Sequence, residues 1–207
     1  LPGAKLEIRD ADGSLVEGWA SGKVPHTVRG LELEKEYTLT ETRAPDGYAE
    51  AESIVFKLVQ NGTEQVNEVY EKSDDAWVKL DDATVIMQDA PVLDIDKTDI
   101  AGNLLPGATL TIRDANDEII DTWVTDYKTH RVPVSDDYIK LSDKETEYIY
   151  TLTEDAAPAG FEIANSVQFK LETVDDGISL FVRENADAEW TRADKRLIQM
   201  IDEAIPR

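Results

Sequence analysis

The chain has 207 residues, of which 41% are hydrophobic and 31% charged, a composition typical of a globular protein and not of a disordered one. Its formal net charge of −23 argues against nucleic-acid binding through a basic patch and against electrostatic docking on an anionic membrane. The absence of cysteine excludes disulfides, a thiolate nucleophile and a Cys-based zinc site.

Short alternating or β-branched segments, divided by turn residues, predict an all-β fold. A hairpin is expected first, at LEIRDADGSLVEGWA (6–20), around Asp-Ala-Asp-Gly. Further strands are expected at EYTLTE (36–41), SIVFKLV (53–59), EVYEK (68–72) and TVIMQD (84–89). The pattern favours two packed antiparallel sheets in each domain.

The second half of the chain repeats the first. LPGATLTIRDAND (105–117) matches LPGAKLEIRDADG (1–13), with residue numbers that differ by 104 (107 − 3). After an insertion around 135–147 the difference becomes 113 (154 − 41). Two copies of one domain, at 1–91 and 92–207, explain this pattern.

The strands expected in the second copy are VLDIDKTD (92–99), TLTIRD (109–114), IIDTWVT (119–125), YIYTLTE (148–154), SVQFKLE (166–172), ISLFVRE (178–184) and RLIQMID (196–202).

One motif occurs at the same place in both copies. YTLTETRAPDGY, which starts at Tyr37, returns as YTLTEDAAPAGF, which starts at Tyr150. Alternate side chains of a strand share a face, so Glu41 continues the row of Tyr37 and Leu39, and Glu154 repeats the arrangement. A carboxylate aimed at a core costs free energy unless it is paired or protonated, so its repetition indicates a selected feature.

Two further ionisable residues of the second copy continue apolar rows. Lys97 follows Leu93 and Ile95 on one face of the first strand, and Asp202 ends an apolar row on the last strand. The alternation alone leaves two interpretations open. Either each row ends at a solvated rim, or Lys97, Glu154 and Asp202 meet in a buried site.

These residues also carry a family resemblance. The succession K-T-D-x-x-G-x-x-L-P-G-A, then Y-T-L-T-E-x-x-A-P-x-G-[YF], then a last strand ending in Asp, resembles the Cna-B-type domains of Gram-positive surface adhesins and pilins. The motif at Tyr37 also resembles the pilin E-box. The resemblance covers essentially the whole chain. It implies two tandem transthyretin-like, Ig-like β-sandwiches and a secreted protein attached to the bacterial cell wall.

In that family, a lysine of the first strand and an Asp or Asn of the last join spontaneously through an intramolecular isopeptide bond, assisted by the E-box Glu. The resemblance implies that Lys97 is the amine nucleophile, Asp202 the electrophile and Glu154 the catalytic proton shuttle. Burial disfavours charged amines and carboxylates, so a neutral amine can attack a neutral acid. This single turnover on itself does not make the chain an enzyme, and neither a metal nor a cofactor is expected.

The first copy departs from the pattern. Glu41 and Asp89 are orphan equivalents of Glu154 and Asp202, because the matching lysine would fall at position 97 − 104 = −7, before Leu1. Lys5 aligns with the following strand of the second copy and is a poor substitute. The first domain is therefore expected to lack its N-terminal strand and its cross-link, and to expose a sheet edge that a donated strand can join.

The function favoured by these features is a structural stalk, with neighbouring domains of the same surface protein as partners. The alternative is an adhesin module that recognises a host matrix protein or glycan through the insertion near 136–144, since loops on rigid scaffolds carry recognition. A hydrolase is disfavoured because His26 and His130 fall in predicted loops far from any nucleophile. No apolar run approaches the roughly 20 residues that span a bilayer, so no membrane insertion is expected.

Overall fold

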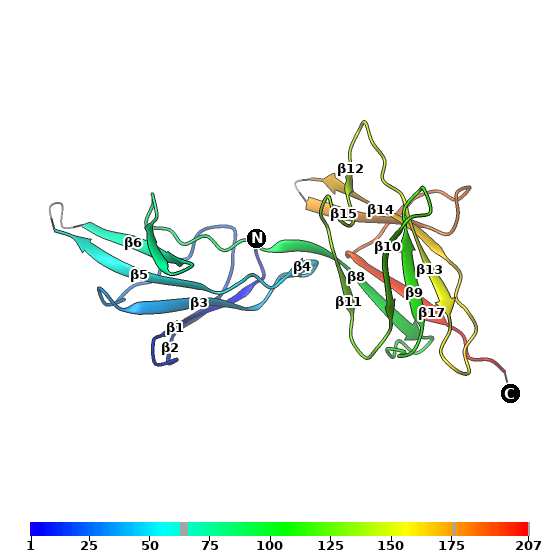
Figure 1. Ribbon diagram of the computed structural model, residues 1–207, viewed down its shortest axis with the longest axis horizontal. Coiled ribbons are helices and arrows are strands. Elements are labelled where there is room, and N and C mark those ends of the chain that lie inside the picture. The colour runs from blue at the N-terminus through cyan, green and yellow to red at the C-terminus, as the bar shows by residue number, and fades with distance from the viewer. Residues whose placement is uncertain (63–65, 176, 207) are drawn as a thin grey trace. The chain divides into compact units, whose positions relative to one another are not determined.

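The computed structural model describes residues 1–62, 66–175 and 177–206, and the chain divides into two compact units, Leu1–Ala90 and Pro91–Arg207 (Figure 1). Among the described residues every regular element is a β-strand, which confirms the predicted all-β class. Within the same residues no helix is long and apolar enough to cross a membrane.

The first unit holds one sheet of six strands in the order β2-β1-β3-β5-β6-β7, with antiparallel neighbours. Its β-branched and aromatic residues suit a pleated surface that is buried on one face. The strands are β1 (Lys5–Asp10), β2 (Leu15–Ala20), β3 (Glu36–Arg43), β5 (Ile54–Asn61), β6 (Val66–Ser73) and β7 (Ala76–Lys79), and the short β4 (Tyr48–Ala49) follows β3.

The expected first hairpin forms because an aspartate closes its turn. The Oδ1 atom of Asp10 accepts hydrogen bonds from the backbone N–H groups of Asp12 and Ser14, at 3.1 and 2.8 Å. Gly13 takes a φ of +81°, a conformation that glycine adopts without steric cost. In the second unit Asp114 closes the equivalent turn in the same way.

The second unit is a sandwich of two sheets (Figure 1). The larger sheet has the order β10-β9-β13-β14-β15-β16, with β12 beside β14, and the smaller places β8 between β11 and β17. The strands of the larger sheet are β9 (Thr109–Arg113), β10 (Ile119–Val124), β12 (Leu141–Ser142), β13 (Tyr150–Ala156), β14 (Val167–Val174), β15 (Gly177–Arg183) and β16 (Thr191–Arg192). Those of the smaller sheet are β8 (Ala90–Asp99), β11 (His130–Pro133) and β17 (Leu197–Asp202).

The prediction of purely antiparallel sheets is wrong for two pairs of strands, β12 with β14 and β17 with β8. β17 runs parallel to β8, with Ile198 opposite Ile95 and Met200 opposite Lys97. The two strands are separated by nearly the whole unit, so no hairpin forces them to run in opposite directions. The first and last strands of the unit therefore lie side by side.

Apolar side chains from both sheets fill the second unit. Leu93 and Ile95 of β8 face Leu110 and Leu152 of the larger sheet, and all four are at most 2% exposed. The other buried members of this core are Ala108, Ile112, Val132, Val134, Ile139, Tyr150, Phe169, Leu171, Leu180, Ile198 and Met200. The alternation of each strand thus places its apolar row between the sheets, as the sequence predicts.

The first unit does not form a second sheet from its described residues. The expected strand TVIMQD (84–89) is absent, and residues 26–29, the counterparts of β11, are not in a strand either. In the second unit both counterparts pair with β8. No described residue takes the place of β8 in the first unit, so neither segment has a backbone partner with which to form a ladder.

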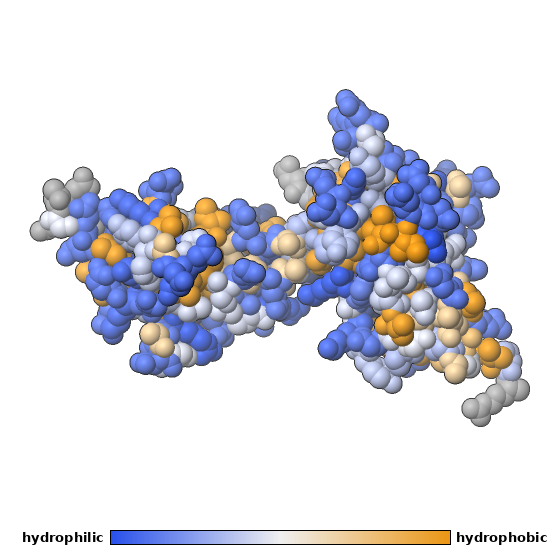
Figure 2. Space-filling model, in the orientation of Figure 1, coloured by the Kyte–Doolittle hydropathy of each residue, from blue (hydrophilic) through white to orange (hydrophobic). Residues whose placement is uncertain are grey.

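The core of the first unit contains fewer buried residues than the core of the second unit. Its buried members are Ile8, Tyr37, Leu39, Phe56 and Val69. Val85 and Met87 pack against this core but stay partly exposed, whereas their counterparts in β17 are at most 4% exposed. Apolar side chains also reach the surface of this unit (Figure 2). Val24 and Ile86 are among the exposed apolar residues.

Amide hydrogen exchange followed by mass spectrometry tests this difference between the two units. Amides of residues 84–89 should exchange at least about 100-fold faster than those of 197–202, because only the latter segment is paired in a ladder. The two segments align residue by residue, so each serves as the control for the other. Equal protection would show that 84–89 pairs with a strand and would contradict the open second sheet.

Candidate functional site

Lys97 lies on β8 at the edge of the second unit's core. Its side chain is only 1% exposed, although a lysine is rarely buried unless it is paired. The alternation of the strand requires this position, because Lys97 shares the inward face of Leu93 and Ile95.

Two carboxyl groups surround the Lys97 amine. Its Nζ atom contacts Oδ1 of Asp202, at the end of β17, and lies 3.1 Å from Oε2 of Glu154, on β13 of the opposite sheet. Both carboxyl side chains are 0% exposed. The structure thus brings together the three residues that the sequence singled out, and their burial is incompatible with a solvated rim.

The Pro-x-Gly turn after β13 places a hydrogen-bond donor against Glu154. The N–H of Phe161 donates to the carbonyl of Pro158 at 3.1 Å, and Gly160 takes a φ of +90°. Such a positive φ at the third position of a turn favours glycine. The chain then returns along β13, and the N–H of Ala164 donates to Oε2 of Glu154 at 2.7 Å.

Burial raises the pKa of Glu154, while the hydrogen bond from Ala164 and the contact with Lys97 act in the opposite direction. Oε1 of Glu154 and Oδ2 of Asp202 are both buried without a hydrogen-bond partner among the described residues. A buried carboxyl oxygen without a donor favours the protonated acid. The site therefore favours the protonated acid of Glu154.

The first unit holds the same carboxyl pair without the lysine. Glu41 is 4% exposed and accepts a hydrogen bond from the N–H of Ala51 at 2.8 Å, in the same manner as Glu154. Burial raises the pKa of Glu41, and the negative charge of Asp89 raises it further. Burial also raises the pKa of Asp89, against the weaker effect of the Leu1 amino group. No described lysine takes the place of Lys97, and Lys5 is exposed on β1.

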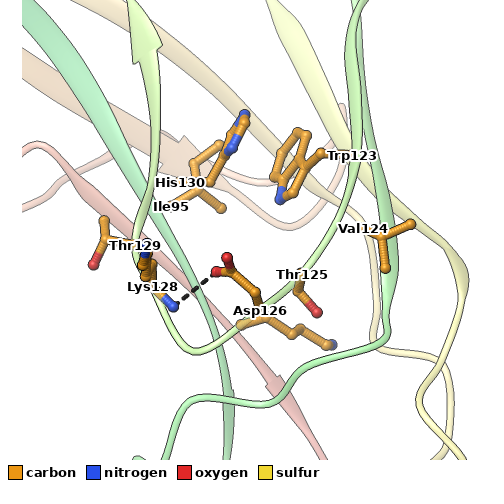
Figure 3. A pocket seen from close by; sticks show the side chains of 9 residues that line it. Ile95, Trp123, Val124, Thr125, Asp126, Lys128, Thr129 and His130 are labelled. Atoms are coloured by element: carbon orange, nitrogen blue, oxygen red, sulfur yellow. Dashed lines mark hydrogen bonds between the residues drawn. The ribbon is translucent and has the colours of Figure 1, made fainter.

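A cavity of about 190 Å³ adjoins Lys97 in the second unit (Figure 3). It lies between the end of β10 and the start of β11, and the rings of Trp123 and His130 stack beside it with centroids 3.9 Å apart. The Nε2 atom of His130 lies 2.8 Å from Oδ2 of Asp121. These rings line the same cavity as Lys97.

The prediction that both histidines fall in loops is wrong for His130, which lies half-buried on β11. Residues equivalent to this stack also lie together in the first unit, where Trp19 stacks on His26 at 4.4 Å between centroids and Glu17 contacts the imidazole at 2.7 Å. The acid, the tryptophan and the histidine all repeat at the difference of 104. That shared spacing is the sequence signal that could have revealed the cluster.

Within the described ranges, no group of three or more His, Cys, Asp or Glu side chains is arranged to hold a metal ion. The chemistry available at the buried site of the second unit is that of one amine and two carboxyl groups. An amine in contact with a carboxylic acid can form an amide by losing water.

Comparison with known proteins finds one matching family. The sequence model of one family, "SpaA: Prealbumin-like fold domain", matches residues 1–72 and 92–185. A search of curated proteins finds no match.

Solved structures also align with the chain, at low similarity. The pilus adhesin SpaC from Lactobacillus rhamnosus GG, in its open conformation, is 13% identical with a TM-score of 0.38, and the alignment covers 99% of this chain and 29% of the adhesin. The shaft pilin SpaA from the same organism is 10% identical with a TM-score of 0.36, over 100% of this chain and 89% of the pilin. The Bacillus anthracis TIE protein is 19% identical with a TM-score of 0.29, and the alignment covers 99% of this chain and 31% of that protein.

The raised pKa of Glu41 predicts how the stability of the first unit depends on pH. A carboxyl group whose pKa is higher in the folded state binds more protons there than in the unfolded chain. The free energy of unfolding should therefore fall as the pH rises from the ordinary glutamate range through the raised pKa.

Urea denaturation of the first unit tests this dependence. The chain is equilibrated in urea at pH 5 and at pH 7.5, and each sample then receives an amide-exchange pulse at one fixed pH. Exchange on β3 reports the urea midpoint of unfolding at each equilibration pH. The Glu41→Gln variant should lose part of the pH dependence of its stability. Glu36→Gln, at an exposed position on the same strand, should keep the full dependence. Identical pH dependence in the native chain and Glu41→Gln would contradict the burial of an ionisable Glu41.

Proposed function

The chain belongs to the family of SpaA prealbumin-like fold domains, and we propose that it is a stalk segment of a Gram-positive surface adhesin or pilin, cross-linked internally between Lys97 and Asp202. The observation that carries this proposal is the contact between the Lys97 amine and the Asp202 carboxyl, with Glu154 beside both and all three side chains sealed from water. The proposed location is the bacterial cell surface.

The cross-link forms by loss of one water. The neutral amine of Lys97 attacks the carbonyl carbon of Asp202, a C–N bond forms, and the acid's hydroxyl leaves with a proton that came from the amine. Glu154, whose protonated form is favoured by burial, hydrogen-bonds the reacting carboxyl group and transfers the proton. Because the fold holds the reactants in contact, the effective molarity is about 10⁵ M or more.

The surroundings of the site suit this reaction. The side chains of Lys97, Glu154 and Asp202 are at most 1% exposed, so bulk water does not surround the reacting groups. The cavity beside Lys97 has room for the released water, since one water needs only about 15 Å³ of such volume. The reaction occurs once per molecule, so we propose a structural protein and not an enzyme.

The cross-link would hold the first and last strands of the unit together. β8 and β17 are neighbours in one sheet, so a bond between Lys97 and Asp202 carries tension between the ends of the unit without opening the larger sheet. It closes a loop of 105 residues. By analogy with a disulfide, such a closure penalises the unfolded state by about 4–5 kcal/mol. The bond would thus give a chain without cysteine a covalent cross-link that does not need a disulfide.

The alternative function, a ligand-binding adhesin module, has less support in the insertion of the second unit. Ile139 of the insertion is fully buried in the core, and β12 pairs with β14. The N–H of Lys140 donates to the Tyr150 hydroxyl at 2.9 Å, an anchor into the same core. These contacts tie the insertion into the fold, as a stalk requires.

Intact-mass spectrometry tests the proposed bond. The native chain should be lighter than its sequence by one water, and the Lys97→Met and Glu154→Gln variants should show the full mass. Glu162→Gln, an exposed position after the same turn, should behave like the native chain. A native chain of full mass would refute the cross-link, and a deficit of two waters would show that the first unit is also cross-linked.

Chemical denaturation of the second unit tests the structural role of the bond. The uncross-linked Glu154→Gln variant should lose about 4–5 kcal/mol of unfolding free energy, because its unfolded state regains the entropy of the open loop. Urea unfolding followed by circular dichroism supplies the measurement, with Glu162→Gln as the control. A variant as stable as the native chain would show that the bond is absent or does not constrain unfolding.

A further inference from the structure

We propose that the open edge of β10, in the second unit, binds an extended basic segment of a partner protein as an added β-strand. β10 is the last strand of the larger sheet, and β9 is its only strand neighbour among the described residues. Its other side therefore presents backbone N–H and C=O groups outside any ladder, which is the feature that strand addition uses. The inference goes beyond the proposed function and does not depend on a bond between Lys97 and Asp202.

The three other sheet edges of this unit are less suited to a new strand. β16 is only two residues long, and β11 has four residues, carries the cation of Arg131 and ends in Pro133. Just beyond β17 the chain pairs with the 160–162 turn, where the N–H of Glu162 donates to the carbonyl of Glu203 at 3.0 Å. β10 has six residues and neither a proline nor a basic side chain, the features that protect many sheet edges.

Acidic residues flank the open edge at both ends. From the turn before β10 to the residue before β11, positions 114–129, the chain has five acidic residues and one lysine. Asp117 and Glu118 are exposed just before β10, and Asp126 is exposed just after it. Arg113, 3.8 Å from Asp117, offsets only one of these charges. A strand with basic residues at both ends would meet opposite charges, whereas a second copy of this chain, with its net charge of −23, would be repelled.

Asp121, the one charged residue of β10, adds to this selectivity. Its Oδ2 atom contacts Nε2 of His130 at 2.8 Å, and the His130 ring stacks on Trp123 of the same strand. A charge of this kind on an edge strand disfavours a partner that places an apolar or an acidic residue opposite it. A lysine or an arginine opposite Asp121 would form an opposite-charge pair instead.

Apolar side chains of β10 give an added strand a surface on which to pack. Ile119 and Val124, at the two ends of the strand, are 56% and 65% exposed. From Asp121 to Val124 the strand pairs with β9 residue by residue, so a new strand would continue a regular pleat. Together, the edge and its charges define the ligand as an extended segment with β-branched residues in its centre and basic residues at both ends.

Fluorescence anisotropy with labelled peptides and the full chain tests the proposal. The probe is fluorescein-KKVTVTVTKK, which should bind saturably. The peptide KKVTPTPTKK has the same charge, but proline removes N–H groups from the ladder, so it should bind at least about 10-fold more weakly. EEVTVTVTEE should also bind at least about 10-fold more weakly, because its ends are repelled. No saturable binding of the probe, or equal binding of either control peptide, would overturn the proposal.

Matched chain variants separate the edge from the overall charge. Ile119→Lys combined with Val124→Lys should weaken probe binding at least about 10-fold, because it adds like charge and removes apolar contacts at the edge. Ile86→Lys combined with Ile163→Lys adds the same charge at exposed positions outside β10 and should bind like the native chain. Equal weakening by both pairs would show that net charge alone controls binding and would overturn the proposal.

Amide exchange of the native chain locates the bound strand without any substitution. With the probe present, residues 119–124 should gain protection, whereas 167–174 in the interior of the same sheet should not change. Gained protection at other residues only would overturn the proposal. Protection of 119–124 that rises with chain concentration in the absence of peptide would assign the edge to a second copy and would also overturn it. A chain of full mass that binds the probe would refute the cross-link and leave this inference standing.

Discussion

The position of one strand, β8, controls both the folding and the chemistry of this protein. In the second unit its backbone pairs with β11 on one side and β17 on the other, and its inward face carries Leu93, Ile95 and then Lys97. In the first unit no described residue takes that position, and the two flanking segments stay unpaired over a thin core. The same strand thus completes the sandwich and delivers the amine to its carboxyl partners.

Burial of three ionisable groups in one cluster is costly unless the charges are removed. Two buried carboxyl groups and one amine cannot all be charged without a large desolvation penalty, and two of the carboxyl oxygens lack a hydrogen-bond donor. Amide formation between Lys97 and Asp202 converts two ionisable groups into one neutral group. The free energy that opposes burial in the unreacted site therefore favours the proposed product.

Much of this arrangement was predictable from the sequence because strand alternation is a local property. The inward orientation of Lys97, Glu154 and Asp202 follows from period-two patterns, and the absence of a β8 counterpart within residues 1–90 follows from the repeat spacing. The pairing partners of a strand are non-local, so the parallel direction of β17 and the loss of the strand at 84–89 did not follow. The stack of Trp123 on His130 was missed because it joins residues of two different sheets, and the approach of one sheet to another is non-local.

Tandem mass spectrometry of a tryptic digest tests the central claim most directly. Cleavage normally follows Lys97, but an acylated lysine is not cut, so a Lys97–Asp202 bond predicts one branched species that contains residues 80–113 and 197–207. Its fragments would locate the cross-link at those two side chains. Separate linear peptides ending at Lys97 and beginning at Leu197 would contradict the account.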